Sequence, residues 1–340
     1  MRFEFYHEGL AGARLLSVDG TVEDALHLSH WEGNTTPEEL RADTSTEIAL
    51  NFAGWPRRGE WARGVEVITN NHFDADGVLS VWAVLNGERA LDLRGELVSA
   101  AEAGDFSEFP DENAVRVSVL LQGGDNPLVP GVNSPLVAHL AGGAEVDEGR
   151  AYELVLPEVE RVLTRTDEYE PLWRDGWAQI ERGLDSFARG ESRVEEDAES
   201  RLSVVTLGRE LYGRTGFLPL AHAVPYTAIA HNARGEIFLV AVPMAGGWGY
   251  RIDYPYYSWA ETYTRPRVAR RDLAPLVERL NELEGAAAGG GWKPDRGELT
   301  SAVKFLDAGG TPAASRLRPE EVAAGLRAEL LKHVPLARAS

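Results

Sequence analysis

The chain has 340 residues, 44% of them hydrophobic and 26% charged, which is enough apolar material for a folded core and excludes wholesale disorder. The 54 acidic and 34 basic residues give a formal net charge of −20, which argues against a long nucleic-acid duplex as partner. The absence of cysteine excludes disulfides, zinc thiolate sites, iron–sulfur clusters and cysteine nucleophiles. No apolar run reaches the roughly 18 residues of a membrane span, and the N-terminus lacks the apolar core of a signal peptide, so we expect a cytoplasmic protein with no membrane partner.

The first part of the chain is predicted to alternate strands with helices. Strands are expected at residues 13–18, 24–31, 64–71 and 115–121, where apolar or β-branched runs end near Gly, Asn or Asp. Helices are expected over residues 78–86 and from the Ser/Thr cap that precedes Glu47, a capping-box pattern. This alternation predicts an α/β fold with a mostly parallel sheet in an N-terminal domain, residues 1–148.

Residues 149–200 are predicted to connect this domain to a second one. An apolar stripe with helical spacing predicts a helix whose tryptophans pack in the core, at Trp173, Trp177, Ile180, Leu184 and Phe187. The acid-rich residues 191–200 show no apolar period and are predicted to be a linker. Residues 201–340 are predicted to form a smaller α/β domain, with strands at 202–207 and 236–242 and helices at 272–285 and 318–331.

The clearest chemical signal is HFDADG at residues 72–77, between a predicted strand and a predicted helix. His72, Asp74 and Asp76 alternate along the loop, so their side chains can converge on metal ions. Carboxylates with an imidazole suit Mn²⁺ or Mg²⁺. Gly77 allows a tight turn into the helix, whose N-terminus favours a phosphate nearby.

Two other interpretations of this loop compete with a metal site. A calcium loop of the EF-hand type needs a Glu at its twelfth position, where this chain has Ala83, so that interpretation fails. Ordinary turn chemistry stays open, because Asp and Gly also close strand ends without binding a ligand. On that interpretation the chain is a scaffold without a metal.

Asp19 and His30 are further candidate ligands. Asp19 directly follows an apolar strand, and His30 lies near the end of the next one. In a parallel sheet both would face the same edge as residues 72–77. His27 lies earlier within its run and is not expected to join them.

These motifs resemble those of the DHH phosphoesterase superfamily, which includes RecJ-type exonucleases, oligoribonucleases, exopolyphosphatases and family II pyrophosphatases. Residues 72–77 resemble its first motif, Asp19 the lone aspartate of its second, SHWEGN at residues 29–34 its Asp-His-His motif, and Ala103-Gly104-Asp105 its fourth. The resemblance implies one or two Mn²⁺ or Mg²⁺ ions held by Asp19, His30, His72, Asp74, Asp76 and Asp105. It also implies catalytic roles for His30, Asp74 and Asp76.

The chain departs from the superfamily in two ways. The superfamily's first motif here follows Asp19 and the Ser-His-Trp run instead of preceding them, which implies a circular permutation that keeps the strands together in space. Asp-His-His has become Ser-His-Trp, so Trp31 stands where the superfamily has an imidazole that contacts phosphate. The second departure bears on catalysis more than on metal binding.

Two segments in the C-terminal half are candidate phosphate sites. The superfamily's substrate-binding domain has a Gly-Gly-Gly-His loop, and here Gly289, Gly290 and Gly291 precede Trp292. Such a loop can bring N–H groups close to an anion or can be a plain flexible loop. In the basic segment at residues 264–271, Arg265 and Arg267 can clamp a phosphate or can balance nearby acids on a solvated turn. Aromatic residues just upstream, Trp259 among them, can stack on a base or simply pack.

The sequence therefore predicts a two-domain, metal-dependent phosphoesterase-like protein. Its substrate would be small and phosphorylated, such as a short oligonucleotide, a dinucleotide or a polyphosphate fragment, because the acidic chain repels long polyanions. The alternative is a catalytically inactive metal- or nucleotide-binding protein on the same fold, which the tryptophans at the two expected histidine positions favour.

Overall fold

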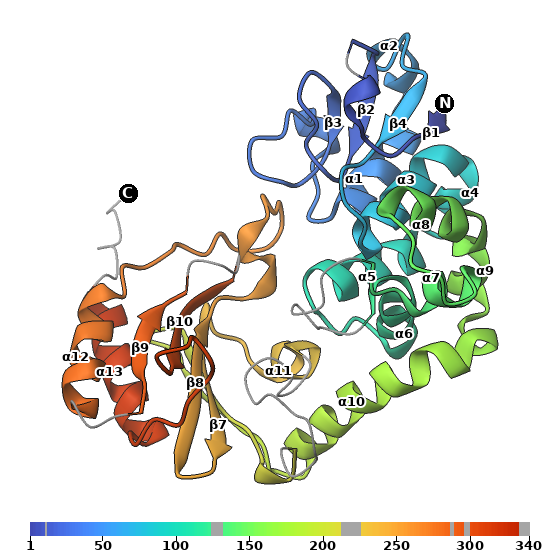
Figure 1. Ribbon diagram of the computed structural model, residues 1–340. Coiled ribbons are helices and arrows are strands. Elements are labelled where there is room, and N and C mark those ends of the chain that lie inside the picture. The colour runs from blue at the N-terminus through green and yellow to red at the C-terminus, as the bar shows by residue number, and fades with distance from the viewer. Residues whose placement is uncertain (11, 124–131, 212–225, 286–288, 296–299, 333–340) are drawn as a thin grey trace. The chain divides into compact units, whose positions relative to one another are not determined.

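The computed structural model describes residues 1–10, 12–123, 132–211, 226–285, 289–295 and 300–332 (Figure 1). The chain divides into two compact units: unit 1 comprises Met1–Ala178 and Trp259–Arg267, and unit 2 comprises Gln179–Ser258 and Val268–Ser340. Each unit combines helices with a sheet, so the predicted α/β class is confirmed. Within the described residues, no helix is both long and apolar enough to span a membrane.

Unit 1 is built on a four-stranded sheet with the order β1-β4-β2-β3, in which every pairing is parallel, as predicted. Its strands are β1 (Arg2–Phe3), β2 (Leu15–Val18), β3 (Leu26–Leu28) and β4 (Val67–Thr69). All four residues of β2 are buried, the pattern of a parallel strand covered on both faces. The strands predicted at residues 13–18, 24–31 and 64–71 are therefore present, each in a shorter form.

Helices make up the rest of unit 1: α1 (Ser45–Gly54), α2 (Arg58–Trp61), α3 (Ala75–Asn86), α4 (Glu88–Asp92), α5 (Arg94–Asp105), α6 (Glu112–Gln122), α7 (Pro135–Leu140), α8 (Glu148–Val155) and α9 (Val159–Thr164). Short 3-10 turns lie at Glu8–Leu10, Glu38–Leu40, Leu156–Glu158 and Thr166–Tyr169. Helix α1 begins as predicted, because the Thr44 side chain accepts the N–H of Glu47. Helix α3 begins at Ala75, earlier than predicted, because Asp74 caps it.

Residues 115–121 are helical, and the predicted strand there is wrong. They belong to α6, whose first turn is capped by the Asp111 carboxylate accepting the N–H of Ala114. The valine-rich run suggested a strand by composition. Val115, Val117 and Val119 alternate with Arg116 and Ser118, which imitates the period of a strand, although Val117 and Leu120 are fully buried on a helix.

Helix α10 (Glu170–Ala188) contains the apolar stripe predicted for residues 173–187. Trp173 and Trp177 are buried, and the Arg116 guanidinium lies 4.7 Å and 4.8 Å from their ring centroids, so their predicted packing role is confirmed. The predicted linker at residues 191–200 is wrong, because β5 (Arg193–Asp197) pairs antiparallel with β6. Its charged side chains are typical of a strand at a sheet edge.

Unit 2 is built on a six-stranded sheet with the order β5-β6-β7-β8-β10-β9, parallel only between β6 and β7. Its further strands are β6 (Leu202–Thr206), β7 (Ile237–Met244), β8 (Gly247–Asp253), β9 (Gly291–Pro294) and β10 (Ser301–Leu306), and its helices are α11 (Tyr226–Asn232), α12 (Ala274–Glu284) and α13 (Pro319–Lys332). Short 3-10 turns lie at Arg209–Leu211 and Tyr256–Trp259. Both predicted strands and both predicted helices of this part are present.

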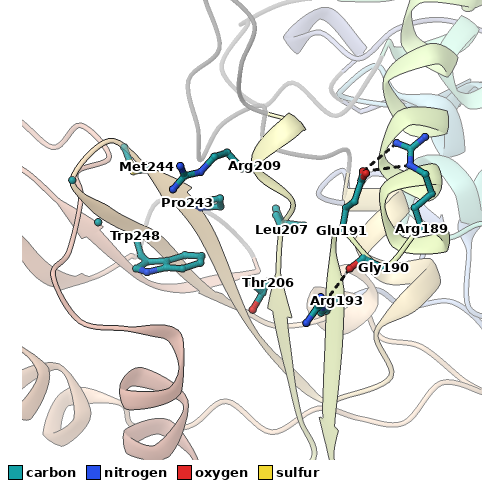
Figure 2. A pocket seen from close by; sticks show the side chains of 12 residues that line it. Arg189, Gly190, Glu191, Arg193, Thr206, Leu207, Arg209, Pro243, Met244 and Trp248 are labelled. Carbon is teal, nitrogen blue, oxygen red and sulfur yellow. Dashed lines mark hydrogen bonds and ion pairs between the residues drawn. The ribbon is translucent and has the colours of Figure 1, made fainter.

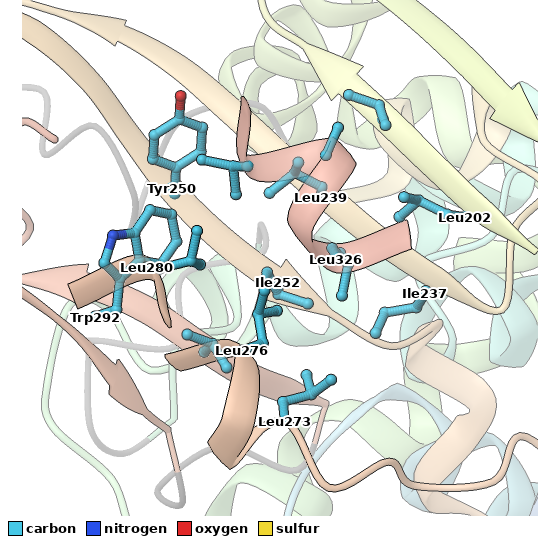
Figure 3. Packing of buried hydrophobic residues seen from close by; sticks show 14 of the residues in the cluster. Leu202, Ile237, Leu239, Tyr250, Ile252, Leu273, Leu276, Leu280, Trp292 and Leu326 are labelled. Carbon is cyan, nitrogen blue, oxygen red and sulfur yellow. The ribbon is translucent and has the colours of Figure 1, made fainter. Parts of the chain in front are cut away.

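The two faces of this sheet are covered by different helices. Along β7, Ile237 and Leu239 pack with α12 and α13, whereas Phe238 and Val240 pack with α11 on the other face. Figure 3 shows the first of these clusters, with Tyr250 and Trp292 at one end of it. The alternation follows from the period of two along a strand and gives unit 2 a core on each side of the sheet.

Candidate metal centre

The parallel sheet of unit 1 brings three predicted residues to one edge. Asp19 follows β2, His30 follows β3 and His72 follows β4, and the carboxyl ends of parallel strands share an edge. Because β2 lies between β4 and β3, Asp19 lies between the two histidines. Asp19 itself has a left-handed backbone with φ of 69°, a strained conformation of the kind that gathers at functional sites.

Two groups of potential ligands meet at this edge. The inner group is Asp19, His30 and Asp76, and the outer group is Asp19, His72 and Asp74. In the inner group, His30 Nε2 lies 3.7 Å from Asp19 Oδ1 and 3.8 Å from Asp76 Oδ2, and it also lies 3.1 Å from Asp105 Oδ2. In the outer group, His72 Nε2 lies 2.9 Å from Asp19 Oδ2 and 3.3 Å from Asp74 Oδ2.

These separations fit a metal ion. Ligand atoms about 2.1 Å from one Mn²⁺ or Mg²⁺ lie at most about 4.2 Å apart, and every distance given above is within that limit. The buried ligand atoms His30 Nε2, His72 Nε2 and Asp105 Oδ2 make ion-pair contacts, at 3.1 Å between His30 and Asp105 and at 2.9 Å between His72 and Asp19, but no hydrogen bond of good geometry among the described residues. Buried polar atoms are normally satisfied, so the three atoms are accounted for if they face a cation.

The other nitrogen of each imidazole is already engaged. His30 Nδ1 lies 2.7 Å from the carbonyl oxygen of Asp43, and His72 Nδ1 lies 2.9 Å from Asn71 Oδ1. A proton on Nδ1 donates to these oxygens, so Nε2 is the ring atom directed at the carboxylates and becomes a ligand once it has lost its own proton. This is the arrangement by which neighbouring groups orient metal-ligating histidines in proteins.

Asp74 and Asp76 also have structural roles. Asp74 Oδ1 accepts the N–H of Gly77 at 2.7 Å and caps α3, so the turn interpretation of residues 72–77 is correct for that oxygen. Asp76 accepts the N–H groups of Ser45 and Thr46, at 2.7 Å and 2.8 Å, at the N-terminus of α1. The α1 N-terminus thus orients Asp76, and its positive end stabilises a carboxylate there.

The ionisation of the centre reflects its surplus of carboxylates. Burial lowers the pKa of both imidazoles, but the surrounding aspartates outweigh it and raise the pKa of His30 to about 10 and of His72 to about 12. Burial raises the pKa of Asp19, but the two histidines lower it to about 2. Burial raises the pKa of Asp105 to about 6 against the opposing charge of His30, and burial with the charges of its neighbours raises that of Asp76 well above its usual range. Without a metal, the imidazoles are therefore the counter-cations of the cluster.

Sequence reasoning missed the residues that support Asp19. Asn70 Nδ2 lies 3.4 Å from Asp19 Oδ2 and donates to Tyr152 Oη at 2.9 Å, and Tyr152 donates to the carbonyl oxygen of His72 at 3.0 Å. Asn70 was visible as a polar residue directly between a strand and the HFDADG loop. Tyr152 lies on α8, and nothing near it in the sequence pointed to this edge.

This network explains why residue 77 is glycine. A Cβ at Gly77 would lie 2.5 Å from Asn70 Nδ2 and 2.5 Å from Tyr152 Oη. Replacing a helical glycine by alanine usually stabilises a protein by up to about 1 kcal/mol. For Gly77→Ala we expect the opposite sign, a loss of about 1–3 kcal/mol in the free energy of unfolding, because the methyl group overpacks the site.

Urea unfolding measures this change. The matched control is Gly95→Ala in the first turn of α5, where nothing lies within 4 Å of the added Cβ, and it should not destabilise the protein. Equal effects of the two substitutions would contradict the close packing of Asn70 and Tyr152 on α3.

The remaining predicted residues lie elsewhere. His27 makes its own hydrogen bonds, with its Nε2 2.8 Å from the carbonyl oxygen of Val22, and does not join the centre. The Arg265 guanidinium donates to three carboxylates, those of Asp43, Glu102 and Glu108, so a phosphate would compete with them. The exposed Arg267 has no such partner within the described residues. Phosphate binding by Arg265 and Arg267 stays a prediction.

The predicted glycine loop belongs to unit 2. Gly291 begins β9, and a Cβ at Gly290 would lie 2.7 Å from the carbonyl oxygen of Leu306, so the chain is closely packed there. Trp292, at the position of the superfamily's histidine, is buried in the core. A role for Gly289, Gly290 and Gly291 in binding substrate also stays a prediction.

Unit 2 has a separate pocket of about 760 Å³ (Figure 2). Its lining includes Arg189, Arg193 and Arg209 beside Trp248 and a single carboxylate, Glu191. Glu191 pairs with Arg189 at 3.2 Å, and among the described residues no carboxylate pairs with Arg193 or Arg209. The pocket therefore carries net positive charge within an acidic chain and suits a small anion better than a cation.

Fold and site together define an α/β protein with a buried aspartate–histidine cluster that can hold metal ions. Residues 3–327 match a family of unknown function, DUF6687, and the chain belongs to this family. A search of curated proteins gave no match.

Proposed function

We propose that this protein is a metal-dependent phosphoesterase, with a pair of Mn²⁺ or Mg²⁺ ions in unit 1. The observation that carries the proposal is that Asp19 belongs to both ligand groups. Its Oδ1 faces His30 and its Oδ2 faces His72. With one oxygen toward each ligand set, Asp19 would contribute a ligand to each of two ions, and a pair of ions is what two-metal hydrolases use. The resemblance to the DHH superfamily, which predicted the five residues of the two groups and Asp105 beside them, also supports this assignment.

The residues around the centre would enclose the inner ion and leave the outer ion closer to solvent. Bound ions of this kind activate a water and stabilise the charge on the oxygens of an in-line displacement. Asp76 is oriented by α1 and His30 by the Asp43 carbonyl, so the inner group is rigid. His72 and Asp74 are 26% and 28% exposed, whereas the side chain of His30 is fully buried, so substrate and water would approach from the outer group.

The substrate would be small. A net charge of −20 repels long polyanions. Arg265 lies near the centre, but its guanidinium already donates hydrogen bonds to carboxylates. A short oligonucleotide, a dinucleotide or a polyphosphate fragment meets this condition, because it carries few charges for the ions to neutralise.

A second candidate function is metal or nucleotide binding without turnover. Trp31 favours it, because an indole can donate a hydrogen bond but cannot carry the positive charge of an imidazolium. Its ring packs against the rings of His72 and Trp259, at centroid distances of 5.3 Å and 4.7 Å. The indole therefore fills this side of the centre with apolar surface.

Asp74→Asn tests the proposed function with little risk to the fold. Asn is as good a helix cap as Asp, so α3 should form, while the outer group loses a charged ligand. We expect two Mn²⁺ ions to bind the metal-stripped wild type in calorimetry and the outer one to bind the variant weakly. Mn²⁺-dependent hydrolysis of a panel of dinucleotides, short oligonucleotides and polyphosphates should fall by at least about 100-fold in the variant.

The matched control is Asp111→Asn, which alters the cap of α6 in the same way and should leave binding and hydrolysis unchanged. Binding of two ions without hydrolysis of any substrate would favour the second candidate function. An absence of Mn²⁺ binding by the wild type would overturn both and leave residues 72–77 as a capping turn.

A further inference from the structure

The segment Trp259–Arg267, which we call the strap, belongs to unit 1 although the residues on both sides of it belong to unit 2. Unit 1 is otherwise formed by the continuous stretch Met1–Ala178. Placing the strap in unit 1 restricts the chain at both ends of the strap and so costs conformational entropy. The contacts of the strap with the rest of unit 1 must offset this cost.

Four of the strap's hydrogen bonds converge on one buried residue, Asp43. The Asp43 carboxylate accepts the N–H groups of Tyr263 and Thr264, the hydroxyl of Thr264, and an N–H of Arg265 at 2.6 Å. Such charge-assisted bonds are among the strong ones in proteins, and several on one carboxylate hold it in a single position. The backbone of Asp43 is held with it.

The backbone of Asp43 is what orients His30. Its carbonyl oxygen lies 2.7 Å from His30 Nδ1 and so holds the ring with Nε2 facing the inner group. The strap also touches His30 directly. The Glu261 N–H donates to the His30 carbonyl oxygen at 2.7 Å, and the Trp259 ring meets the imidazole edge-on at 4.9 Å between centroids.

The strap reaches the other side of the inner group through Arg265. Its guanidinium bonds to Glu102 and Glu108, on either side of Asp105 in the chain, and lies 4.7 Å from the centre of the Phe106 ring. Phe106 in turn packs against His30 at 5.8 Å between ring centroids. Arg265 thus braces the segment that carries Asp105.

The outer group has no comparable support from the strap. Throughout the part of the chain that the structure describes, no hydrogen bond or ion pair joins a strap residue to His72 or Asp74. Those two residues are instead held by Asn71, by the cap of α3 and by the Tyr152 hydroxyl on the His72 carbonyl.

We propose that the strap is a positioning element for the inner metal ion and not for the outer one, acting through Asp43 on His30 and through Arg265 on the segment of Asp105. This inference rests on the proposed two-metal site. It assigns Arg265 a positioning role in place of a phosphate clamp. It also means that the metal centre of unit 1 is complete only when the strap is in place.

Arg265→Lys in the full-length protein tests the inference. Lysine keeps the charge but cannot present the guanidinium fork to three carboxylates at once. We expect the inner Mn²⁺ to bind about 10- to 100-fold more weakly in calorimetry, the usual effect of losing outer support for a ligand, and the outer Mn²⁺ to bind as in the wild type. One further equivalent of Mn²⁺ is then added to protein whose outer site is already saturated. The electron paramagnetic resonance spectrum should show an exchange-coupled pair of Mn²⁺ ions in the wild type and isolated Mn²⁺ in the variant.

The matched control is Arg267→Lys, an exposed position on the same strap, which should leave both affinities unchanged. Since Arg265 joins several carboxylates, its replacement can unfold unit 1. Thr264→Val, which removes only the hydroxyl donor to Asp43, is therefore measured beside it and should weaken the same inner ion to a smaller extent.

The outcomes separate the inference from the proposed function. Wild-type affinities for both ions in folded Arg265→Lys and Thr264→Val, or equal weakening of both ions, would overturn the inference and leave the two-metal site standing. A wild type that binds no Mn²⁺ would overturn the proposed function and the inference with it.

Discussion

Asp19→Asn is expected to abolish tight binding of both metal ions. Asp19 is the one residue common to the inner and outer groups, and each of its oxygens faces a different histidine. An amide offers one neutral oxygen in place of two that share a negative charge. The affinity for each Mn²⁺ should fall by more than the roughly 10- to 100-fold that is typical of a lost supporting contact.

Asp24→Asn is the matched control for this substitution. Asp24 follows Asp19 in the β2–β3 connection, has a left-handed backbone with φ of 60°, and is exposed. Asn tolerates this conformation as well as Asp does, so neither substitution adds backbone strain. Calorimetry on metal-stripped protein compares the three proteins. Retention of one wild-type affinity by Asp19→Asn would show that Asp19 serves a single ion.

The approach of His72, Asp19 and His30 to one another could be predicted from the sequence, because each follows an apolar strand and parallel strands share an edge. The order of the strands could not. That β2 separates β4 from β3 depends on tertiary packing, and this order is what makes Asp19 common to both groups.

Contacts between segments that are far apart in the chain could not be predicted from the sequence either. Asp43 and Arg265 are 222 positions apart, and Asn70 and Tyr152 are 82 apart, so no local period or spacing connects them. Arg265 belongs to a basic cluster in the sequence, which suggested a phosphate clamp. Its neighbours in the fold are carboxylates, which the sequence around it does not reveal.

The error at residues 115–121 has a different origin. Val115, Val117 and Val119 alternate with other residues as in a strand, yet the run is buried on most sides as a helix. The signal that decides between the two is the cap at Asp111, which precedes the apolar run by a full turn. Composition within the run was therefore a poorer guide than the residue before it.

Metal affinity is expected to rise steeply with pH, at about tenfold per pH unit for each proton that a bound ion displaces. In the metal-free protein, burial lowers the pKa of the imidazoles, but the aspartates raise the pKa of His30 to about 10 and that of His72 to about 12. Both rings are therefore protonated at neutral pH, and each must lose the proton on Nε2 before that atom can bind an ion. The proton thus competes with the metal below the raised pKa, and affinity increases as pH rises toward it.

Calorimetry at pH 6, 7 and 8 in buffers of different ionisation enthalpy measures both the affinity and the number of protons released. We expect at least one proton per ion and a gain in affinity of about 100-fold across this range. His7→Gln, which removes an exposed histidine outside the centre, should keep both values. His30→Gln should lower the number of protons released by the inner ion, because its ligand no longer carries one. An affinity for Mn²⁺ that does not depend on pH, with no proton release, would mean that the imidazoles do not ligate the ions. The imidazoles would then remain protonated and act as counter-cations to the aspartates in an ion-paired network.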